Sequence, residues 1–577
     1  KSFELTKVIH LLEDPLTANL KEKHLFTLKN LLKKSQIGFI LKELTGIAKI
    51  LNICAEKVKD HHEYLPILCE ALKICSLPFL KEKSSDELNY AKDATDFLSH
   101  MGNILMKIIL KKNKSEFCVC VSVKHLEGLQ VTSPGYRLQL LERSDLAQTL
   151  LLSMAALENQ PQIKLKLLQT LQFLSSSSDK NCALMLSARG AETMCLHMNE
   201  DDPTRQMLLR TSDILWNLLE RGCREDVTAQ LNSMECILSL KEAFLRSFEY
   251  SDRQVTNVLL MIITVIAETL TSLLIVDCSR FNENQIVCIY ASVKNPNPSV
   301  CDIQINYSQE DLKMKKLLLN LLIIMSNDMA AVQIYREERV ILALLTLMKP
   351  PGALSEWQTV ARDWSVSQQE ALQLQALTAL AAIAPLLLDN YASCQGNTCL
   401  LLLLDWCVKQ DAEFERGNNV RSAERGVKKV QVLYCIRVLR SVTASGDETV
   451  NQDLCDQGLI NQLLGILTQM EANSNDKDIV TIQIMTDIQL ILAVLCESDM
   501  HRKELFGSEG VEMVIHFLKK GSHKFYSGLG HNKLTLTTID CVWSCIVGCY
   551  TTEDYFLAKG GVCLLLDMLS VSSALIF

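Results

Sequence analysis

Proline, glycine and aromatic residues are scarce in this chain of 577 residues. Eleven prolines and 22 glycines are too few for extensive β-rich or disordered regions. Aromatic residues make up 6% of the chain although 48% of it is hydrophobic, so Leu, Ile, Val, Ala, Met and Cys supply most of the apolar surface. Unbranched and small side chains of this kind interdigitate well between packed helices. The composition predicts an all-α protein.

The sequence also lacks the short motifs that mark common catalytic and cofactor sites. It contains no G-x-x-x-x-G-K-[ST] phosphate loop, no G-x-S-x-G nucleophile elbow and no strand-linked G-x-G-x-x-G. Its 11 histidines are not paired with acids or cysteines in a pattern typical of a catalytic triad. We therefore expect no enzymatic activity, no catalytic residue, no cofactor and no small-molecule substrate.

Three groups of residues resemble metal ligands. Cys541, Cys545 and Cys549 are spaced by four and could hold a soft metal ion from one helix face. Such spacing is more often a packing ridge against a neighbouring helix, and we prefer that interpretation. The run His61–Glu63 lacks the i, i+4 histidines of a zinc helix, and the pair Cys118–Cys120 places its thiols on different helix faces. We expect no metal site.

The cysteines and the longest apolar run indicate where the chain resides. The 22 cysteines lie largely inside apolar runs and form no C-x-x-C pair, which favours a reduced, intracellular protein. The run Val258–Val276 approaches transmembrane length, but Glu268 at its centre favours a buried helix of a soluble protein. The charged, amphipathic start KSFELTKVIHLLED does not resemble a signal peptide. We expect no contact with a membrane.

The net charge of −9 argues against nucleic acid as the main partner, because phosphate binding requires a basic surface. The charge is uneven: residues 1–136 hold 20 Lys, no Arg and 16 acidic residues, a net charge of +4. This asymmetry could orient the protein between partners of opposite sign. Two solvated surfaces of different composition explain it equally simply, and we prefer that explanation.

One unit recurs along the chain: a small-residue turn, a short apolar helix and a longer apolar helix. Three copies of the turn and short helix read LCDQGLINQLLGIL (454–467), LFGSEGVEMVIHFL (505–518) and LAKGGVCLLLDML (557–569). The steps from Gly458 to Gly510 and on to Gly561 are 52 and 51 residues. Such a period predicts stacked helical units that cannot bury their apolar faces alone. A stack of this kind offers surface for partners and indicates a binding scaffold.

The pattern predicts three regions. Residues 1–110 form Lys-rich helical repeats, 111–136 a connection, and 137–577 further repeats. Polar insertions are expected near 291–310, 349–368 and 410–429, either on a binding face or as tolerated extra length. Because residue 1 is Lys and the last residues, VSSALIF, are apolar, we expect both ends to be cut from a longer protein.

The unit, with its G-G/V-x-x-L-L turn, resembles the armadillo repeat. This resemblance implies a right-handed α-solenoid, a superhelix of stacked helical repeats used for protein binding. One branch of the armadillo family binds peptides through Trp and Asn residues one turn apart on successive helices. Here Trp216 and Asn217 are adjacent and the other long helices carry no such ladder. Linear nuclear-import signals are therefore not expected as ligands.

A closer resemblance is carried by SLPFLKEKSSDELNYAKD (76–93), the stretch from EALQLQ to CQGN (370–397) and GCYTTEDYFLAKGG (548–561). These segments are similar to a family of armadillo proteins associated with cilia and flagella, whereas residues 111–135 and 269–308 match it poorly. The resemblance implies a component of the axoneme, in the central-pair apparatus of motile cilia and sperm flagella. The implied partners are other proteins of that apparatus, such as sperm flagellar protein 2. No functional residue follows from the resemblance.

Our leading hypothesis is a structural scaffold, located in the cytoplasm and the axoneme, that docks several partners and supports the assembly and stability of sperm flagella and motile cilia. The alternative is a soluble cytoplasmic cargo or signalling adaptor of armadillo type. Acidic tubulin tails would repel an acidic chain, so microtubule association should be indirect, with the Lys-rich N-terminal region as the exception. The residues that bind partners are not predicted.

Overall fold

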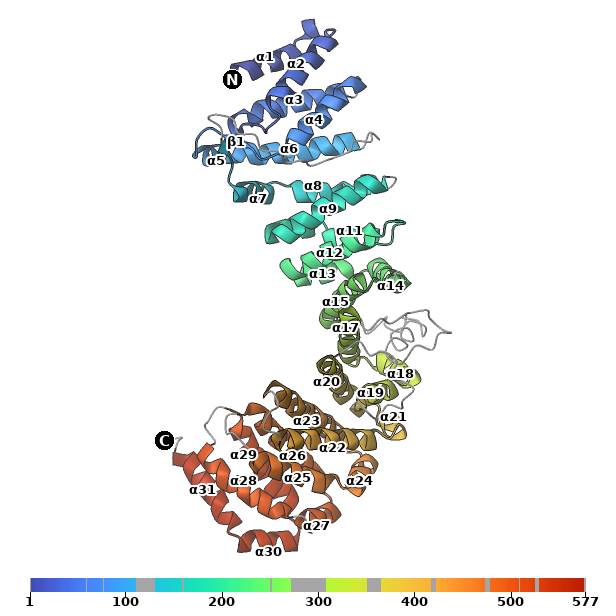
Figure 1. The fold of residues 1–577 in the computed structure, drawn as a ribbon, viewed down its shortest axis with the longest axis vertical. Coiled ribbons are helices and arrows are strands. Elements are labelled where there is room, and N and C mark those ends of the chain that lie inside the picture. Colours follow the sequence, from blue (N-terminus) through green and yellow to red (C-terminus); the bar gives the residue numbers. More distant parts are fainter. Residues whose placement is uncertain are drawn as a thin grey trace. The chain divides into compact units, whose positions relative to one another are not determined.

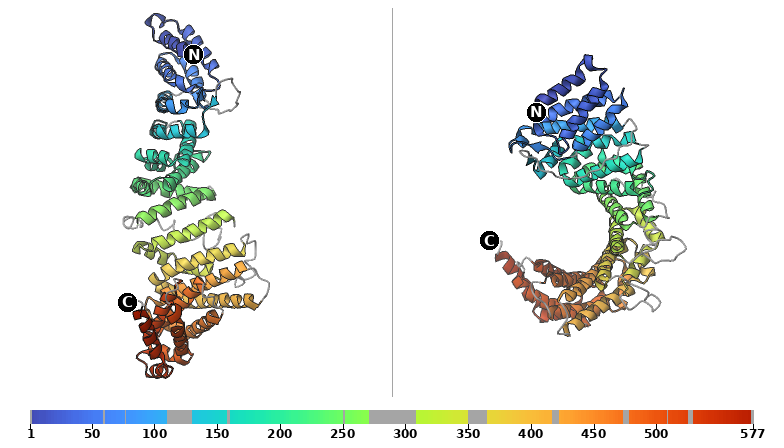
Figure 2. Two further views of the ribbon diagram at one scale, coloured as in Figure 1. Left: turned by 90° about the vertical axis from the view of Figure 1, so that its left-hand side faces the viewer. Right: turned by 45° about the horizontal axis from the view of Figure 1, so that its top comes forward.

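The computed structural model describes residues 2–574 apart from 59, 76, 110–129, 158–159, 250–251, 271–307, 350–364, 417–421, 473–477, 508 and 525–528. It divides into two compact units, Lys1–Ser247 and Phe248–Phe577. Most of the connection predicted at 111–136 lies outside the described residues. In each unit successive helical layers are stacked on one another (Figure 1 and Figure 2).

The first unit consists of α1 (Ser2–Glu13), α2 (Lys21–Lys34), α3 (Leu44–Lys57), α4 (Leu65–Cys75), α5 (Asp86–Asn89), α6 (Ala91–Ile109), α7 (Pro134–Arg143), α8 (Leu146–Leu152), α9 (Pro161–Ser177), α10 (Asp179–Ser187), α11 (Gly190–His197), α12 (Gln206–Arg221), α13 (Arg224–Leu231) and α14 (Met234–Glu249). The last two residues of α14 belong to the second unit.

The second unit continues with α15 (Arg253–Leu270), α17 (Gln309–Met325), α18 (Met329–Glu337), α19 (Val340–Leu347), α20 (Val366–Ile383), α21 (Leu388–Ser393), α22 (Gly396–Arg416), α23 (Ser422–Thr443), α24 (Glu448–Asp456), α25 (Leu459–Ala472), α26 (Ile479–Leu495), α27 (Asp499–Gly507), α28 (Gly510–Lys524), α29 (His531–Cys541), α30 (Tyr550–Ala558) and α31 (Gly561–Ala574). A π-helical turn, η9 (Val542–Ile546), extends α29.

The all-α prediction is confirmed, with one small addition. Strand β1 (Leu80–Lys81) pairs antiparallel with β2 (Gln130–Val131), and Leu80 lies opposite Val131. Two-residue strands leave no detectable alternation in a sequence, so neither was predicted. Their pairing gives hydrogen-bond partners to backbone N–H and C=O groups where the chain is not helical.

The third helices of successive repeats in the second unit pack side by side. Contacts join α15 to α17, α17 to α20, α20 to α23, α23 to α26 and α26 to α29. One continuous apolar core of buried residues, from Leu312 to Met568, lies between them and the shorter helices. Because each layer shields the apolar face of the next, the repeats stabilise one another.

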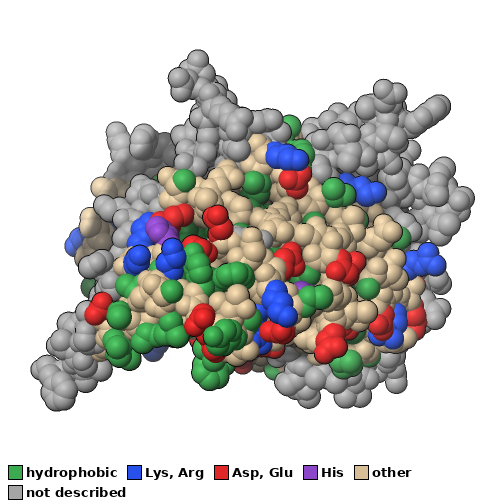
Figure 3. All heavy atoms as spheres, turned by 90° about the horizontal axis from the view of Figure 1, so that it is seen from below, with side chains coloured by type: hydrophobic (Ala, Val, Ile, Leu, Met, Phe, Trp, Pro, Cys, Tyr) green, Lys and Arg blue, Asp and Glu red, His purple; other side chains and the backbone are tan. Residues whose placement is uncertain are grey.

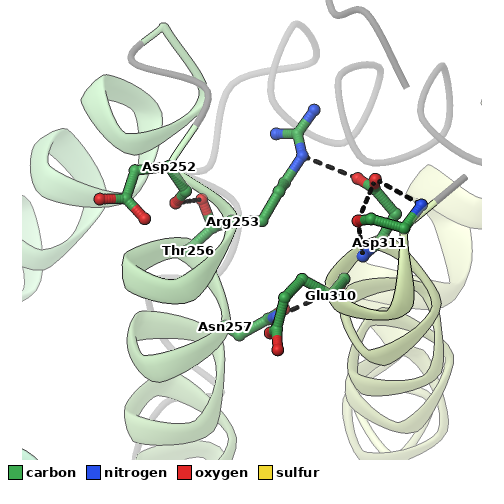
Figure 4. Close-up of polar contacts among 7 residues, drawn as sticks. Asp252, Arg253, Thr256, Asn257, Glu310 and Asp311 are labelled. Carbon is green, nitrogen blue, oxygen red and sulfur yellow. Dashed lines mark hydrogen bonds and ion pairs between the residues drawn. The ribbon is translucent and has the colours of Figure 1, made fainter. Parts of the chain in front are cut away.

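Polar contacts align α15 with α17 although 271–307 separate them in the sequence. Arg253 Nε donates to Asp311 Oδ1 at 2.8 Å, and Asn257 Nδ2 donates to Glu310 Oε2 at 2.8 Å (Figure 4). Ser308 and Asp311 also form a capping box at the start of α17. Asp311 thus both caps its own helix and holds the neighbouring one.

A residue with left-handed backbone conformation stands directly before the second helix of six repeats, at Arg189, Arg339, Gln395, Gly458, Glu509 and Gly560. Gly458, Glu509 and Gly560 follow one another at intervals of 51 residues. The sequence pattern matched Gly458 with Gly510 and Gly561. The residues structurally equivalent to Gly458 are Glu509 and Gly560, one position earlier in each case.

The glycines at the first position of the second helix are required by close packing and not by a left-handed backbone conformation. An added Cβ at Gly396, Gly510 or Gly561 would collide with the side chain five residues earlier, which is Tyr391, Leu505 or Phe556. These glycines serve close packing, whereas Gly458 and Gly560 serve the left-handed turn.

Of the ranges predicted as insertions, 291–310 and 349–368 lie mostly outside the described residues. The chain is helical again from Gln309 and from Val366. Within 410–429, α22 reaches Arg416 and α23 starts at Ser422, so helix occupies most of that range.

The described part of the apolar run 258–276 belongs to α15, where Glu268 is exposed. Among the residues for which coordinates are described, no helix combines the length and the hydropathy that a membrane crossing requires.

Candidate protein-binding surface

We define the third-helix face as the surface of α20, α23, α26 and α29 that faces away from the second helices α19, α22, α25 and α28. Polar side chains cross between neighbouring third helices along it. Lys429 Nζ donates to Asp478 at 2.8 Å between α23 and α26. Thr538 Oγ1 donates to Gln489 Oε1 at 2.8 Å between α29 and α26. These bridges hold adjacent repeats in one register.

Beneath the third-helix face, on the side toward α22, a buried ion pair joins α23 to α20. Lys428 Nζ donates to Glu370 Oε1 at 2.6 Å and lies 4.1 Å from the ring centroid of Trp406. Beside it, Gln431 Nε2 donates to Gln373 Oε1 at 2.5 Å, and Gln373 Nε2 donates to the Met348 carbonyl at 2.6 Å. A buried network in which the members find partners stiffens the packing around it.

Two arginines on α23 share one carboxylate of α26. Arg440 Nη1 donates to Asp487 Oδ1 at 2.5 Å, and Arg437 Nε lies 3.9 Å from Asp487 Oδ2. Arg437 also donates to Gln483 at 3.3 Å and lies 5.2 Å from the ring centroid of Tyr434. Asp487 is 6% exposed, but the arginines are 40% and 43% exposed. Since one carboxylate faces two guanidinium groups, positive charge remains at the surface.

Uncharged side chains are partly exposed on α20 and α26, the third helices that pack on α23. Leu374, Thr378 and Leu490 are half-buried on α20 and α26, and Ile479 is exposed. Arg and Tyr set in an apolar surface are the residues that most often dominate the binding energy of protein interfaces. Arg437 and Arg440 are therefore the candidate contact residues, and sequence reasoning missed both.

The first unit uses similar bridges between α9 and α12. Asn217 Nδ2 donates to Ser175 Oγ at 3.0 Å, and Gln172 Nε2 donates to Asp213 Oδ2 at 2.7 Å. The amide of Asn217 is thus engaged in joining two helices, while Trp216 beside it is half-buried. This geometry favours a structural role for Asn217 over peptide binding.

The cysteines considered as metal ligands lie at packed helix contacts. Cys541 Sγ donates to the Gln489 carbonyl at 3.2 Å, and Cys545 Sγ lies 3.8 Å from the Leu492 carbonyl, both toward α26. Cys549 is buried at the start of α30. Within the described ranges, no three His, Cys, Asp or Glu side chains are placed to hold a metal ion.

Of the other two metal candidates, only the run His61–Glu63 lies within the described residues. His61 and His62 are exposed, and Glu63 accepts an ion pair from Lys21 Nζ at 2.7 Å. Cys118 and Cys120 lie outside the described residues.

A second distinctive surface lies on the last two helices. Val562, Leu566 and Leu569 of α31 are 41%, 59% and 66% exposed. Their counterparts 51 residues earlier on α28 are 0%, 5% and 0% exposed: Val511, Ile515 and Leu518. In the described residues no third helix packs on α31, whereas α29 packs on α28. Figure 3 shows hydrophobic side chains gathered at the lower left of the face seen from below.

Comparisons with known proteins agree with this geometry. The sequence profile described as "Cilia- and flagella-associated protein 69, ARM repeat" matches residues 3–576. The human cilia- and flagella-associated protein 69 is 41% identical over 586 residues, and the mouse protein is 39% identical. Each alignment covers 99% of this chain, which spans 61% of the length of these relatives.

A chain from a structural study of the interaction between cadherin and beta-catenin aligns with 93% of this chain and 99% of its own length, at 12% identity and a TM-score of 0.41. The profile match confirms the resemblance to ciliary and flagellar armadillo proteins. The chain therefore belongs to the cilia- and flagella-associated protein 69 family and forms an armadillo-repeat α-solenoid.

Proposed function

We propose that this chain is part of a structural scaffold of the ciliary and flagellar axoneme, within a projection of the central-pair apparatus. It docks several partner proteins and thereby supports the assembly and stability of sperm flagella and motile cilia. Membership of a family associated with cilia and flagella supports the location. The observation that carries the docking role is the pre-arranged pair Arg437 and Arg440 on the third-helix face.

This pair suits docking because its side chains are already ordered. Asp487, Gln483 and the Tyr434 ring hold the guanidinium groups before a partner arrives. A partner segment with a carboxylate and a few apolar side chains would therefore lose less conformational entropy on binding. The two guanidinium groups supply the positive charge that selects such a segment.

The proposal includes no catalytic step, and the described residues of the third-helix face that it uses are bridging groups. The proposed partners are other proteins of the central apparatus, such as sperm flagellar protein 2, and the association with microtubules is indirect. Binding of nucleic acid, membrane or small molecules forms no part of the proposal.

Extraction of demembranated cilia tests this function in the full-length protein. The scaffold should stay in the axonemal pellet after detergent, whereas a soluble cargo or signalling adaptor should leave with the detergent. Arg437→Ala keeps the Arg440–Asp487 bond and should release part of the protein at a salt concentration that the wild type withstands. Lys503→Ala, at an exposed residue of α27, is the matched control.

Cross-linking mass spectrometry of the same axonemes then identifies the contacts. Cross-links from partner proteins to α20, α23 and α26 are expected. Loss of the wild type with detergent, or partner cross-links confined to α24, α27 and α30, the helices that precede the second helices in their repeats, would contradict the proposal.

A further inference from the structure

The outward face of α2 in the first unit combines lysines with an exposed aromatic ring. Lys23, Phe26, Lys29 and Lys33 follow one another at spacings of three and four, so they share one stripe of the helix. All four side chains are exposed, and Phe26 is 67% exposed. We call these four residues the α2 lysine face.

The opposite side of α2 is anchored to the rest of the unit. His24, Leu28 and Leu32 are buried, and His24 Nδ1 lies 3.1 Å from the Tyr64 hydroxyl. Lys21 Nζ forms an ion pair with Glu63 at 2.7 Å. Because these contacts fix the rotation of α2, the lysine face points away from the core as a rigid surface.

The lysines of this face differ from other lysines of the same unit. Lys42 pairs with Glu82 at 2.7 Å, Lys81 with Glu87 at 2.8 Å and Lys164 with Glu200 at 2.5 Å. Among the described residues, no carboxylate lies within ion-pair distance of the three lysines of the α2 lysine face. The only acidic residue within α2 is Glu22, so the helix surface is strongly positive within a chain of net charge −9.

We propose that the α2 lysine face binds an acidic, glutamate-rich polypeptide segment of a partner protein. The lysines supply the charge complementary to such a segment, and Phe26 supplies an apolar contact between them. This face lies on α2 and shares no residue with the third-helix face. The inference goes beyond the proposed function, because it holds or fails whether or not Arg437 contacts a partner.

The geometry disfavours the two other classes of anionic partner. A membrane-surface helix inserts its apolar side into lipid, but the apolar side of α2 is buried in the protein. Nucleic acid binding requires a broad basic surface, and here three lysines lie beside one ring in an acidic chain.

Fluorescence anisotropy with the complete 577-residue chain tests the proposal. The probe is a fluorescein-labelled peptide of alternating Glu and Gly residues with one Leu. The variant is Lys23→Glu, Lys29→Glu and Lys33→Glu together. The control is Lys166→Glu, Lys180→Glu and Lys313→Glu together, which changes the net charge equally at exposed lysines on three other helices.

The wild type and the control should bind the peptide alike, and the α2 variant should bind it at least about tenfold more weakly. Raising the salt from about 50 to about 300 mM should weaken wild-type binding severalfold, because exposed charges are screened. Phe26→Ala should weaken binding at both salt concentrations, and circular dichroism should show unchanged helix content in every variant.

Three results would overturn the proposal: no binding by the wild type, equal loss in the control and the α2 variant, or unchanged binding by the α2 variant. Tighter lysine-dependent binding of a single-stranded oligonucleotide or of phosphatidylserine vesicles than of the peptide would overturn it as well, by assigning the face to another class of partner.

Discussion

Lys428 and Glu370 form an ion pair between α23 and α20 that is almost removed from water. Their nearest charged atoms are 2.6 Å apart, and their side chains are 8% and 11% exposed. Lys428 also donates to Gln431 at 3.1 Å. The pair lies within the polar network that crosses the third helices, so it reports on how strongly one repeat holds the next.

Lys428→Met should destabilise the contact between α20 and α23 by about 3–5 kcal/mol, because Glu370 is left buried and unpaired. Lys428→Met combined with Glu370→Met should recover most of that loss, since the buried charges disappear together. Hydrogen exchange of the α23 backbone amides measures both effects locally. Equal loss in the single and double variants would contradict the ion-pair interpretation.

Substitutions at the repeat turns should separate the two roles of glycine. Gly561→Ala should cost about 1–3 kcal/mol, because the new Cβ collides with the Phe556 ring. Glu509→Gly should stabilise its turn by about 0.5–1 kcal/mol, because the residue adopts φ of 62°.

Gly465→Ala is the control for these turn variants. No atom lies within 4 Å of the Cβ that it adds within α25, so it should stabilise the helix by about 0.5–1 kcal/mol. Thermal unfolding of the variants measures the differences. If Gly561→Ala left the thermal stability unchanged, the turn would be able to relax around Phe556, contrary to this prediction.

Stability should depend on the charge of Lys315 in α17. Burial lowers the pKa of Lys315 to about 8, against the opposing effect of the Asp311 carboxylate. In the unfolded chain the lysine keeps its proton up to about pH 10.4. Between about pH 8 and about pH 10.4 the unfolded chain therefore holds more protons, so the free energy of unfolding rises with pH.

Lys315→Met should stabilise the protein by about 1–3 kcal/mol at pH 7, because the cost of burying the charge is removed. The gain should shrink as the pH rises from about 8 to about 10. Lys313→Met, at an exposed neighbour on the same helix, should show neither effect. Urea unfolding at several pH values checks this, and a destabilising Lys315→Met at pH 7 would disprove it.

The rate at which each thiol is labelled should depend more on the exposure of the cysteine than on its pKa. Among the cysteines that the structure describes, Cys563 and Cys223 are exposed and should react first. Cys223 should be the slower of the two, because its thiol donates to the Glu225 carboxylate, which raises its pKa. A hydrogen bond with Cys195 lowers the pKa of the Cys236 thiol, but Cys236 is buried and should stay unlabelled. Burial raises the pKa of Cys455 to about 12, which protects it further. Peptide mass spectrometry after maleimide treatment of the native protein measures these rates, and fast labelling of Cys236 would contradict the packing.

Much of the fold was predictable because repeats leave a periodic signal. The turns before α25, α28 and α31 were predicted to within one residue. Cys541 and Cys545 lie at helix contacts, as the spacing of four indicated. The error of one residue arose because a sequence does not show whether a glycine is needed for a left-handed backbone conformation or for close packing. Gly458 supplies a left-handed backbone, while Gly510 makes room for Leu505.

The candidate surface was harder to find, although one signal was present. Arg437 and Arg440 interrupt an apolar helix, and Asp487 interrupts another helix 50 and 47 residues later. Opposite charges about one repeat apart could have suggested contact between neighbouring third helices. The sequence alone could not tell whether these charges are neutralised at a bridge or remain available at the surface.

Composition and periodicity by themselves determined that the chain is all-α and built from repeats, because helix packing imposes a regular apolar pattern. The resemblance to ciliary armadillo proteins came from particular segments, such as residues 370–397 and 548–561. Tertiary structure alone decided which charges are buried in pairs, as at Lys428, and which stay exposed, as at Arg437 and Lys29. The reason is physical: the fate of a charge depends on what a neighbouring layer brings within a few ångströms, and that neighbour lies about one repeat away in the sequence.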